Sequence, residues 1–312
     1  MARLSAATPT HAGIRSRRTW LPIVLFLAPA LALYLVFVFL PIAQGAYYSL
    51  FKWNGLKPLT DFVGVDNYIK AFGTKLFIES VWHNGLIIIL SLLVQIPFSL
   101  ALAVYLNARF PGRAILRLIF FLPYVISEVI TSIMFYLLLQ PDGAVNSVLR
   151  FAGLGWLVQD WFGDLSLVML TMFAVITWKY FGFHMIILLA GLQGIPHELS
   201  EAALIDGAGR WQAFRYVTLP LLGPTLRVSV FLSIIGALQL FDIVWATTRG
   251  GPLHASDTMA TYMYDFGFQR QQMGYGSAVA VILFSMCLIF ALLYQRFVLR
   301  RDTDGALTTT GG

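Results

Sequence analysis

Residues 196–220 read PHELSEAALIDGAGRWQAFRYVTLP and form a polar interval between two long apolar segments. Pro196 suits the first turn of a helix, and Glu198 and Glu201 favour its N-terminal half because the helix dipole is positive there. Gly207 permits the left-handed backbone angles that end a helix. The pattern therefore predicts a short polar helix that stops at this glycine.

A second short helix is predicted over residues 210–217, with Trp211 and Phe214 on one face. Pro220 and Pro224 limit its length and set the start of the next apolar segment. An apolar knob beside paired charges suits docking into a groove of another protein. The alternative is an amphipathic or re-entrant helix at the membrane surface that has no partner.

The composition is that of a membrane protein, since 58% of the 312 residues are hydrophobic and only 12% are charged, against about 25% charged in soluble domains. The net charge of +6 does not indicate a nucleic-acid partner, because the basic residues flank apolar blocks and do not cover one polar domain. The single cysteine, Cys287, excludes an intrachain disulfide, a cysteine metal cluster and a cysteine-pair redox motif. We expect no metal site of any other kind.

Six apolar blocks are long enough to cross about 30 Å of hydrocarbon, which requires roughly 20 helical residues. They do not alternate in the segments of about ten residues that build a membrane barrel. We therefore predict an all-α integral membrane protein with six transmembrane helices, surrounded by lipid. The predicted spans are residues 20–42, 81–106, 118–140, 167–192, 225–247 and 277–298.

The basic residues near the span ends predict the orientation. If the N-terminus is cytosolic, the inner segments hold thirteen Lys and Arg residues and the outer segments hold seven. Both termini are therefore expected in the cytosol. The predicted organisation is a basic cytosolic tail over residues 1–19, a transmembrane domain over residues 20–300 with its polar loop at residues 193–222, and a disordered tail over residues 301–312.

The N-terminus also permits another interpretation. Arg17 and Arg18 before an apolar run resemble a twin-arginine export signal, and residues 28–30 resemble a cleavage site. The apolar run continues to Leu40, which is too long for the core of a signal, and five more spans follow. A basic tail on a first span is therefore favoured.

Several polar and ionisable residues fall within the predicted spans. A charge near the bilayer centre costs at least about 2.5–3.5 kcal/mol, so such side chains must face protein or water. We expect them to line one hydrated cavity, in which polar groups and aromatic rings face the same space. The candidate cavity residues are Glu128, Thr131, Trp178, Lys179, Tyr180, Phe183, Ser233, Gln239 and Asp242.

A structural role is the alternative for some of these side chains. Lys179 can pair with Glu128 or Asp242 to hold the bundle together, and both interpretations stay open. Asp242 lies near the outer end of its span, where a role in gating or subunit contact is favoured. Gln95 is interpreted as a helix–helix contact and His184 as a packing or interfacial residue.

The polar loop resembles one family. It follows the pattern E-A-A-x3-G-x9-I-x-L-P found in bacterial ATP-binding-cassette (ABC) importer permeases, in the expected place between two spans. The only departure is valine in place of isoleucine. The matching positions are Glu201, Ala202, Ala203, Gly207, Val217, Leu219 and Pro220.

A second resemblance lies at the end of the fifth span. Residues 241–252, FDIVWATTRGGP, are similar to the F-D…T-x-G-G-P stretch of the first permease subunit of carbohydrate importers of the maltose and glycerol-phosphate type. The outer segment FVGVDNY, residues 62–68, fits the same group, and the resemblance covers residues 20–300. The outer loop between the first two spans is short compared with that of the enteric maltose permease, so a different contact with the binding protein is expected.

The resemblance implies a type I ABC importer permease in the bacterial inner membrane, with no covalent chemistry of its own. It would pair as a heterodimer with a second permease, bind two copies of a cytosolic ATPase that hold ATP and Mg²⁺, and receive its solute from an extracytoplasmic binding protein. Residues 193–222 would be the coupling loop. The implied ATPase-contact residues are Glu201, Ala202, Ala203, Asp206, Gly207 and Arg210.

Two other functions compete with sugar import. An ion-coupled secondary transporter would use Glu128 and Lys179 as a relay, although no inverted repeat is evident. A membrane enzyme acting on a lipid-linked sugar would need clustered loop carboxylates, which are scattered in this chain. No second histidine follows His197-Glu198 at zinc-protease spacing, and no Walker A sequence occurs, so a partner chain would hold ATP. No arginine cluster lies among the cavity candidates, which favours a neutral solute.

Overall fold

The computed structural model describes residues 20–299, with side chains described from residue 24. This stretch consists of helices, turns and loops with one β-bridge between Phe51 and Phe62, so the all-α prediction is confirmed for it. The predicted tails, residues 1–19 and 301–312, lie outside the described residues. The chain separates into two compact units, one ending at Tyr47 and one beginning at Tyr48, and each is described by itself.

The first unit holds one apolar helix. Its elements are α1 (Trp20–Tyr34), the π-helical turn η1 (Leu35–Phe39) and α2 (Leu40–Tyr48). From Val24 to Tyr48 they form 25 residues that are long and apolar enough to cross a membrane, although Pro29 lies inside the helix. Its apolar side chains are exposed, with Phe26 at 83%, as a lipid-facing helix requires.

Three continuous helices of the second unit are also long and apolar enough to span a membrane. They are α4–η2–α5 (Lys75–Leu90, Ser91–Gln95, Ile96–Asn107), α9 (Val168–Gln193) and α16–η6 (Met273–Tyr294, Gln295–Leu299). The central one is α9, which packs against α5, α6 and α13. Most of the apolar part of α9 is buried, whereas α4–α5 and α16 are covered on a minor part of their surface.

Two further apolar segments are bent pairs. α6 (Arg113–Val125) and α7 (Glu128–Leu138) meet at 95°, and the Arg210–Leu221 segment meets α13 (Gly223–Leu238) at 68°. With each bent pair taken as one span, residues 20–299 hold six spans in the predicted order.

The predicted span over residues 118–140 is therefore not a straight helix. Pro123 lies inside α6 and has no amide hydrogen to donate to the preceding turn. Ile126 and Ser127 then adopt extended backbone angles, with ψ of 138° and 143°, before α7 begins. The predicted span over residues 225–247 is also divided, because α13 ends before α14 (Asp242–Thr247) begins.

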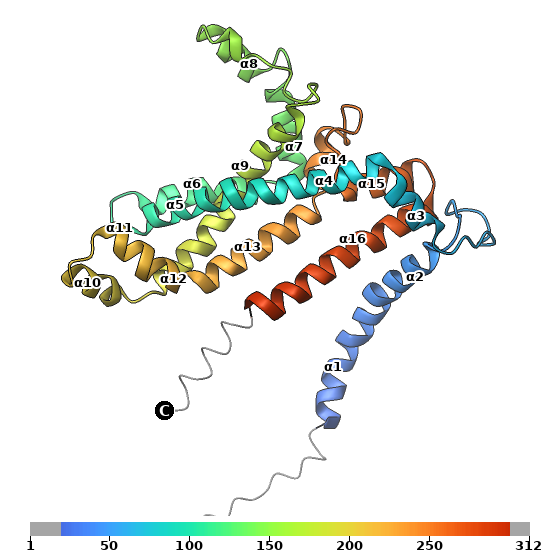
Figure 1. Cartoon of the computed structure of the whole chain (residues 1–312), viewed down its shortest axis with the longest axis horizontal. Helices are drawn as coiled ribbons and strands as arrows, with labels where there is room; N and C mark the ends of the chain where they lie inside the picture. The colour runs from blue at the N-terminus through green and yellow to red at the C-terminus, as the bar shows by residue number, and fades with distance from the viewer. Residues whose placement is uncertain (1–19, 300–312) are drawn as a thin grey trace, which may run out of the picture. The chain divides into compact units, whose positions relative to one another are not determined.

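Short helices gather at the ends of the second unit (Figure 1). One end, which we call the α10 end, carries α10 (His197–Ile205), α11 (Arg210–Ala213), η4 (Phe214–Thr218) and α12 (Leu219–Leu221). The opposite end, the α3 end, carries α3 (Asp66–Gly73), with α15 (Met259–Tyr264) and η5 (Asp265–Gln269) nearby. α14 packs on α7, which leads to α8 (Ala144–Phe151) and the 3-10 turn η3 (Gly155–Leu157).

Three buried apolar clusters follow one another along the continuous helix α4–η2–α5. Phe77 belongs to the cluster at the α3 end, together with Tyr262 of α15. Ile87 belongs to the middle cluster, and Leu106 to the cluster at the α10 end. One helix therefore contributes to the packing of the whole unit from end to end.

Glycines let α9 approach its neighbours closely. A Cβ atom on Gly182 would collide with the backbone carbonyl of Phe120 in α6, and one on Gly191 would lie 2.5 Å from Thr225 Oγ1 in α13. Membrane helices associate through such close backbone contact, because lipid is as apolar as the helix surface. Gly182 thus sets the distance between α6 and α9 near the break in the third span.

We predict that Gly182→Ala destabilises the protein by about 1–3 kcal/mol, because the new methyl group must push a backbone carbonyl away. The control is Gly85→Ala in α4, where an added Cβ finds nothing within 4 Å. Thermal unfolding of the two purified variants in the same detergent measures the difference. Equal midpoints for Gly182→Ala and the unsubstituted protein would contradict the close contact.

Candidate functional site

A cavity of about 300 Å³, here called the central cavity, lies in the middle of the second unit. It forms where two apolar segments break, between the end of α6 and the start of α7 and between the end of α13 and the start of α14. Broken helices leave polar backbone and terminal side chains that face the space between them. Six of the nine predicted cavity residues line it, namely Glu128, Tyr180, Phe183, Ser233, Gln239 and Asp242.

Lys179 of α9 does not line the central cavity. It is 3% exposed, and its Nζ donates to the carbonyl oxygens of Ile126 at 2.5 Å and Tyr124 at 3.4 Å. These carbonyls lie at the C-terminal end of α6, where the helix dipole is negative. Within residues 20–299 no carboxylate lies within 4 Å of this ammonium group, so the ion pair with Glu128 or Asp242 is not formed. Lys179 instead caps the broken helix.

Glu128 places a carboxylate among aromatic rings at the cavity. It is the first residue of α7, at the positive end of that helix dipole. Tyr180 donates its hydroxyl hydrogen to Glu128 Oε1. Tyr124 lies edge to face with Tyr180 and stacks on Phe183, with ring centroids 6.1 Å and 4.7 Å apart. The cavity therefore offers one acidic group and several ring faces on a single wall.

Thr131 and Trp178 lie outside the cavity lining. Thr131 is fully buried, and its Oγ1 has no hydrogen-bond partner in the described part of the chain. Trp178 packs edge-on against Phe135 of α7, with ring centroids 5.0 Å apart. Ser132 donates to the carbonyl of Ile243 at 3.3 Å and so ties α7 to α14. This face of α7 serves packing.

Four further polar side chains line the central cavity without having been predicted there, namely Ser91, Gln95, Tyr124 and His184. Gln95 is 2% exposed, and its Nε2 has no hydrogen-bond partner among the residues that the structure describes. His184 Nδ1 bonds Ser229 Oγ at 2.8 Å, which agrees with its predicted packing role. The i, i+4 spacing of Ser91 and Gln95 within the otherwise apolar residues 86–98 is the sequence signal for this polar face.

A hollow of about 640 Å³ lies at the α10 end, between the end of α5 and the start of α10. We call it the α10 hollow. Both acidic and basic side chains line it, since Arg109 comes from the segment after α5 and Glu198 and Glu201 come from α10. A concave surface with both signs of charge suits a protein partner that presents complementary charges.

The polar loop beside this hollow has the two predicted helices. α10 covers residues 197–205, and Gly207 ends it with φ of +89°. The second helix begins at Arg210 as predicted but continues through η4 and α12. Ala202, Asp206 and Arg210 are exposed, whereas Ala203 is half-buried.

Large apolar side chains of the same loop are exposed. Ile205 is 84% exposed, Trp211 72% and Tyr216 76%. Trp211 and Phe214 share one face, with ring centroids 5.6 Å apart. Exposed apolar side chains beside charged ones mark a surface that a partner covers.

The FDIVWATTRGGP stretch contributes a fixed loop after α14. Gly250 has φ of +83°, and a Cβ atom there would collide with the carboxylate of Asp257. Asp257 is 2% exposed, and its carboxylate forms hydrogen bonds with His254 Nδ1 at 2.6 Å and with Thr261 Oγ1 at 2.9 Å. Burial raises the pKa of Asp257 despite these hydrogen bonds. His83 of α4 bonds the Asp257 carbonyl at 2.8 Å, so the loop is tied to the long helix.

The sequence of this helical unit matches one family. Residues 95–303, more than half of the chain, match the profile described as binding-protein-dependent transport system inner membrane component. The chain belongs to this family. The match begins at Gln95 of the central cavity and includes the α10 loop, so the α10 hollow and all of the central cavity except Ile87 and Ser91 lie in the part that the family shares.

Relatives of this permease align over most of its length. The probable ABC transporter permease YurN of Bacillus subtilis is 34% identical over 276 residues, which cover 88% of this chain and 94% of the relative. The trehalose/maltose permease MalF of Thermococcus litoralis is 32% identical over 273 residues, which cover 87% and 92%.

The fold also matches a solved transporter. A chain of a bacterial alginate ABC transporter, in complex with an alginate pentasaccharide-bound periplasmic protein, superposes with a TM-score of 0.78 at 25% identity. The match covers 91% of this chain and 95% of that one. The predicted resemblance to ABC importer permeases is confirmed, and the chain is a multi-pass inner-membrane transport subunit.

We predict that Lys179→Met lowers the free energy of unfolding by about 1–3 kcal/mol, because two carbonyl groups at the helix break lose their donor. The control is Lys75→Met, since the Lys75 side chain is 88% exposed and pairs with Glu79 at the surface. Thermal unfolding of the purified variants measures both. An unchanged midpoint for Lys179→Met together with lost uptake would show that Lys179 acts on the solute and not on the helix end.

Proposed function

We propose that this permease forms part of the solute path of an ATP-driven importer of a neutral oligosaccharide or similar polyol. One observation carries the proposal. The continuous helix α4–η2–α5 has Ser91 and Gln95 in the central cavity and Val104 and Asn107 in the α10 hollow. A push at the hollow therefore reaches the cavity through one 33-residue helix.

The chemistry of the central cavity supports a sugar as solute. Amide and hydroxyl groups of Gln95, Ser233 and Gln239 match sugar hydroxyls, and the Tyr180 and Phe183 rings match the apolar face of a pyranose. Sugars also appear in the names of relatives, including lactose for LacF of Rhizobium radiobacter and trehalose/maltose for the Thermococcus litoralis permease. We extend this substrate class to the present chain.

The charges in the cavity favour a neutral sugar over an acidic one. Glu128 and Asp242 line it, and no lysine or arginine is among its described lining residues. Two carboxylates in a partly dry space repel an acidic sugar, and the structural relative is involved in the import of the acidic polysaccharide alginate. The proposed solute therefore differs from that of the alginate transporter.

The α10 loop is proposed as the coupling element. Glu201 would form an ion pair in a cleft of the cytosolic ATPase, Gly207 would make the turn, and the exposed Ile205 and Trp211 would be covered by the partner. Two ATPase copies would hold ATP and Mg²⁺, and a second permease would complete the path. Both termini and the α10 end would then face the cytosol, and the α3 end would face the binding protein.

The energy for transport comes from the nucleotide in this proposal. The ATPases must favour one of two states, and the solute must bind more weakly in the inward-facing state for release. The competing ion-coupled mechanism needs a relay between Glu128 and Lys179. Lys179 is held by backbone carbonyls away from the cavity, so that relay has no support.

We predict that Glu201→Ala combined with Gly207→Ala lowers solute-stimulated ATP hydrolysis and uptake about tenfold or more, within the usual range of coupling energies. Gly207 has φ of +89°, where an alanine is strained. The matched control is Gly209→Ala, because Gly209 has φ of −69° and accepts a side chain. Unchanged uptake and hydrolysis in the reconstituted importer would contradict the coupling role.

We predict that Tyr180→Phe lowers uptake of a neutral sugar about tenfold, since the Glu128 carboxylate loses a hydrogen bond worth about 1.5–3 kcal/mol and points unpaired into the cavity. Tyr136→Phe is the control, because Tyr136 stacks on Phe162 and does not line the cavity. Vesicle uptake with equal amounts of assembled complex measures the effect. Equal uptake by the two variants would remove Tyr180 and Glu128 from the solute path.

A further inference from the structure

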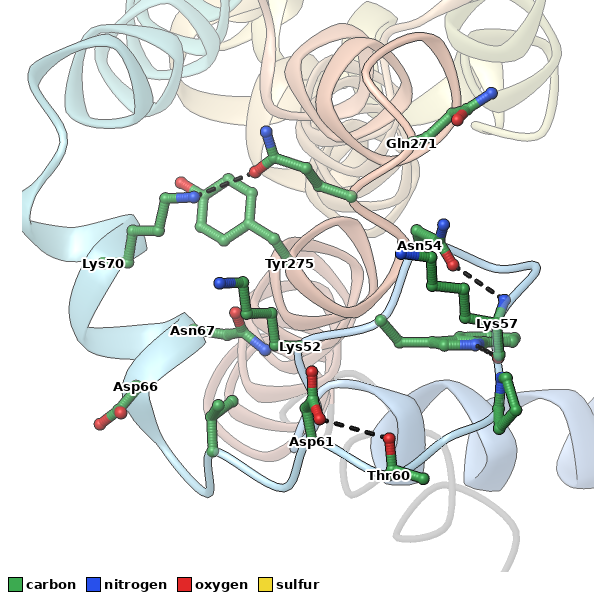
Figure 2. A pocket seen from close by; sticks show the side chains of 14 residues that line it. Lys52, Asn54, Lys57, Thr60, Asp61, Asp66, Asn67, Lys70, Gln271 and Tyr275 are labelled. Atoms are coloured by element: carbon green, nitrogen blue, oxygen red, sulfur yellow. Dashed lines mark hydrogen bonds between the residues drawn. The ribbon is translucent and has the colours of Figure 1, made fainter.

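A pocket of about 730 Å³ lies at the α3 end and has no assigned role (Figure 2). We call it the α3 pocket. Its walls are the loop after α2, the helix α3 and the start of α16. It shares no lining residue with the central cavity, and the buried cluster around Tyr262 and Phe77 lies beside it. The α3 pocket is therefore not a section of the proposed solute path.

The walls of the α3 pocket are held by hydrogen bonds. Gly274 donates its amide hydrogen to the Trp53 carbonyl at 2.9 Å, and a Cβ atom on Gly274 would collide with the Phe51 carbonyl. Asn67 Nδ2 donates to the same Phe51 carbonyl at 3.0 Å. Trp53 Nε1 donates to the Lys57 carbonyl at 2.6 Å. The loop is thus seated on both helices, and the pocket is formed before any partner arrives.

Three lysines give the pocket its chemistry. Lys52, Lys57 and Lys70 are exposed and point around its opening (Figure 2). Lys70 Nζ donates to Gln272 Oε1 at 3.0 Å and lies 4.3 Å from the centroid of the Tyr275 ring. Across the described residues, no carboxylate lies within 4 Å of any of these three ammonium groups. Three ammonium groups without a counter-ion form a receptor for an anionic group.

We propose that the α3 pocket receives an acidic side chain of the extracytoplasmic binding protein when that protein docks on the permease. This inference rests on the proposed function, which places the α3 end outside the membrane. The family depends on a binding protein, and the structural relative is solved with a periplasmic protein bound. The pocket is the concave, basic feature that faces such a partner.

The mixed charge of the lining favours a protein over a lipid headgroup. Asp61 and Asp66 line the same pocket as the lysines, and Asp61 accepts a hydrogen bond from Thr60 at 3.3 Å. Both carboxylates repel a phosphodiester, whereas a protein surface can present an acidic side chain to the lysines and a basic one to the aspartates.

The test replaces the three lysines together, Lys52→Gln, Lys57→Gln and Lys70→Gln, in the complete importer reconstituted in phosphatidylcholine nanodiscs. ATP hydrolysis is measured against the concentration of the solute-loaded binding protein that copurifies with the importer, at about 50 and 200 mM salt. We expect the half-saturating concentration to rise about three- to tenfold and its salt dependence to flatten, with the maximal rate unchanged. Lys57→Glu alone should raise it further than Lys57→Gln.

The matched control is Lys75→Gln, an exposed lysine at the same end that does not line the pocket. Its half-saturating concentration should equal that of the unsubstituted importer. An unchanged value in the triple variant overturns the docking proposal while leaving the proposed function intact. A defect that appears only in nanodiscs containing phosphatidylglycerol assigns the pocket to lipid and also overturns it. Absence of any stimulation of the unsubstituted importer by the binding protein overturns the proposed function itself.

Discussion

The arrangement of the second unit depends on hydrogen bonds from the Lys179 ammonium group to backbone carbonyls at the break between α6 and α7. Between α6 and α7 the backbone is extended, and in lipid its carbonyl groups have no water to bond. Lys179 supplies the donor, since its Nζ bonds the carbonyls of Ile126 and Tyr124. The next residue of α9, Tyr180, donates its hydroxyl hydrogen to Glu128 at the start of α7. The residues on either side of the break, Tyr124 and Glu128, therefore form part of the wall of the central cavity.

Two unbroken helices make the unit stiff between these breaks. α4–η2–α5 joins the α3 end, the central cavity and the α10 hollow over 33 residues, roughly 50 Å at 1.5 Å per residue. α9 carries Tyr180 and Phe183 and leads directly to α10. Relative motion is therefore expected at the bent pairs, where few backbone hydrogen bonds oppose it. Alternating access requires a hinge beside the solute cavity. It also requires rigid helices that connect this cavity to the surface on which a partner acts.

Much of the fold follows from the sequence, because apolar block length, basic flanks and the Gly207 turn are local signals. All six blocks correspond to helical segments, and Gly207 adopts the left-handed angle expected of it. The bend after Pro123 cannot be predicted from the local sequence, since a proline inside a membrane helix is often accommodated without a break. The hydrogen bonds from Lys179 to backbone carbonyls depend on that bend. The sequence alone therefore suggests a carboxylate as the partner of its ammonium group. The sequence indicates a helix–helix contact for Gln95. The place of its side chain in the cavity lining, with an amide that has no partner among the described residues, is seen only in three dimensions.

The unpaired amide of Gln95 bears on the solute state of the cavity. A buried donor costs free energy unless it is paired, so Gln95 Nε2 is suited to donate to a water molecule or a solute in the cavity. A sugar hydroxyl can accept from Gln95 and donate to Glu128 or Asp242, because all three side chains line the same cavity. A cation can pair with the carboxylates but cannot accept a hydrogen bond from Gln95, and an apolar solute can do neither. In the proposed function, this combination of an amide donor and two carboxylates would favour molecules that are donors and acceptors at once, as polyols are.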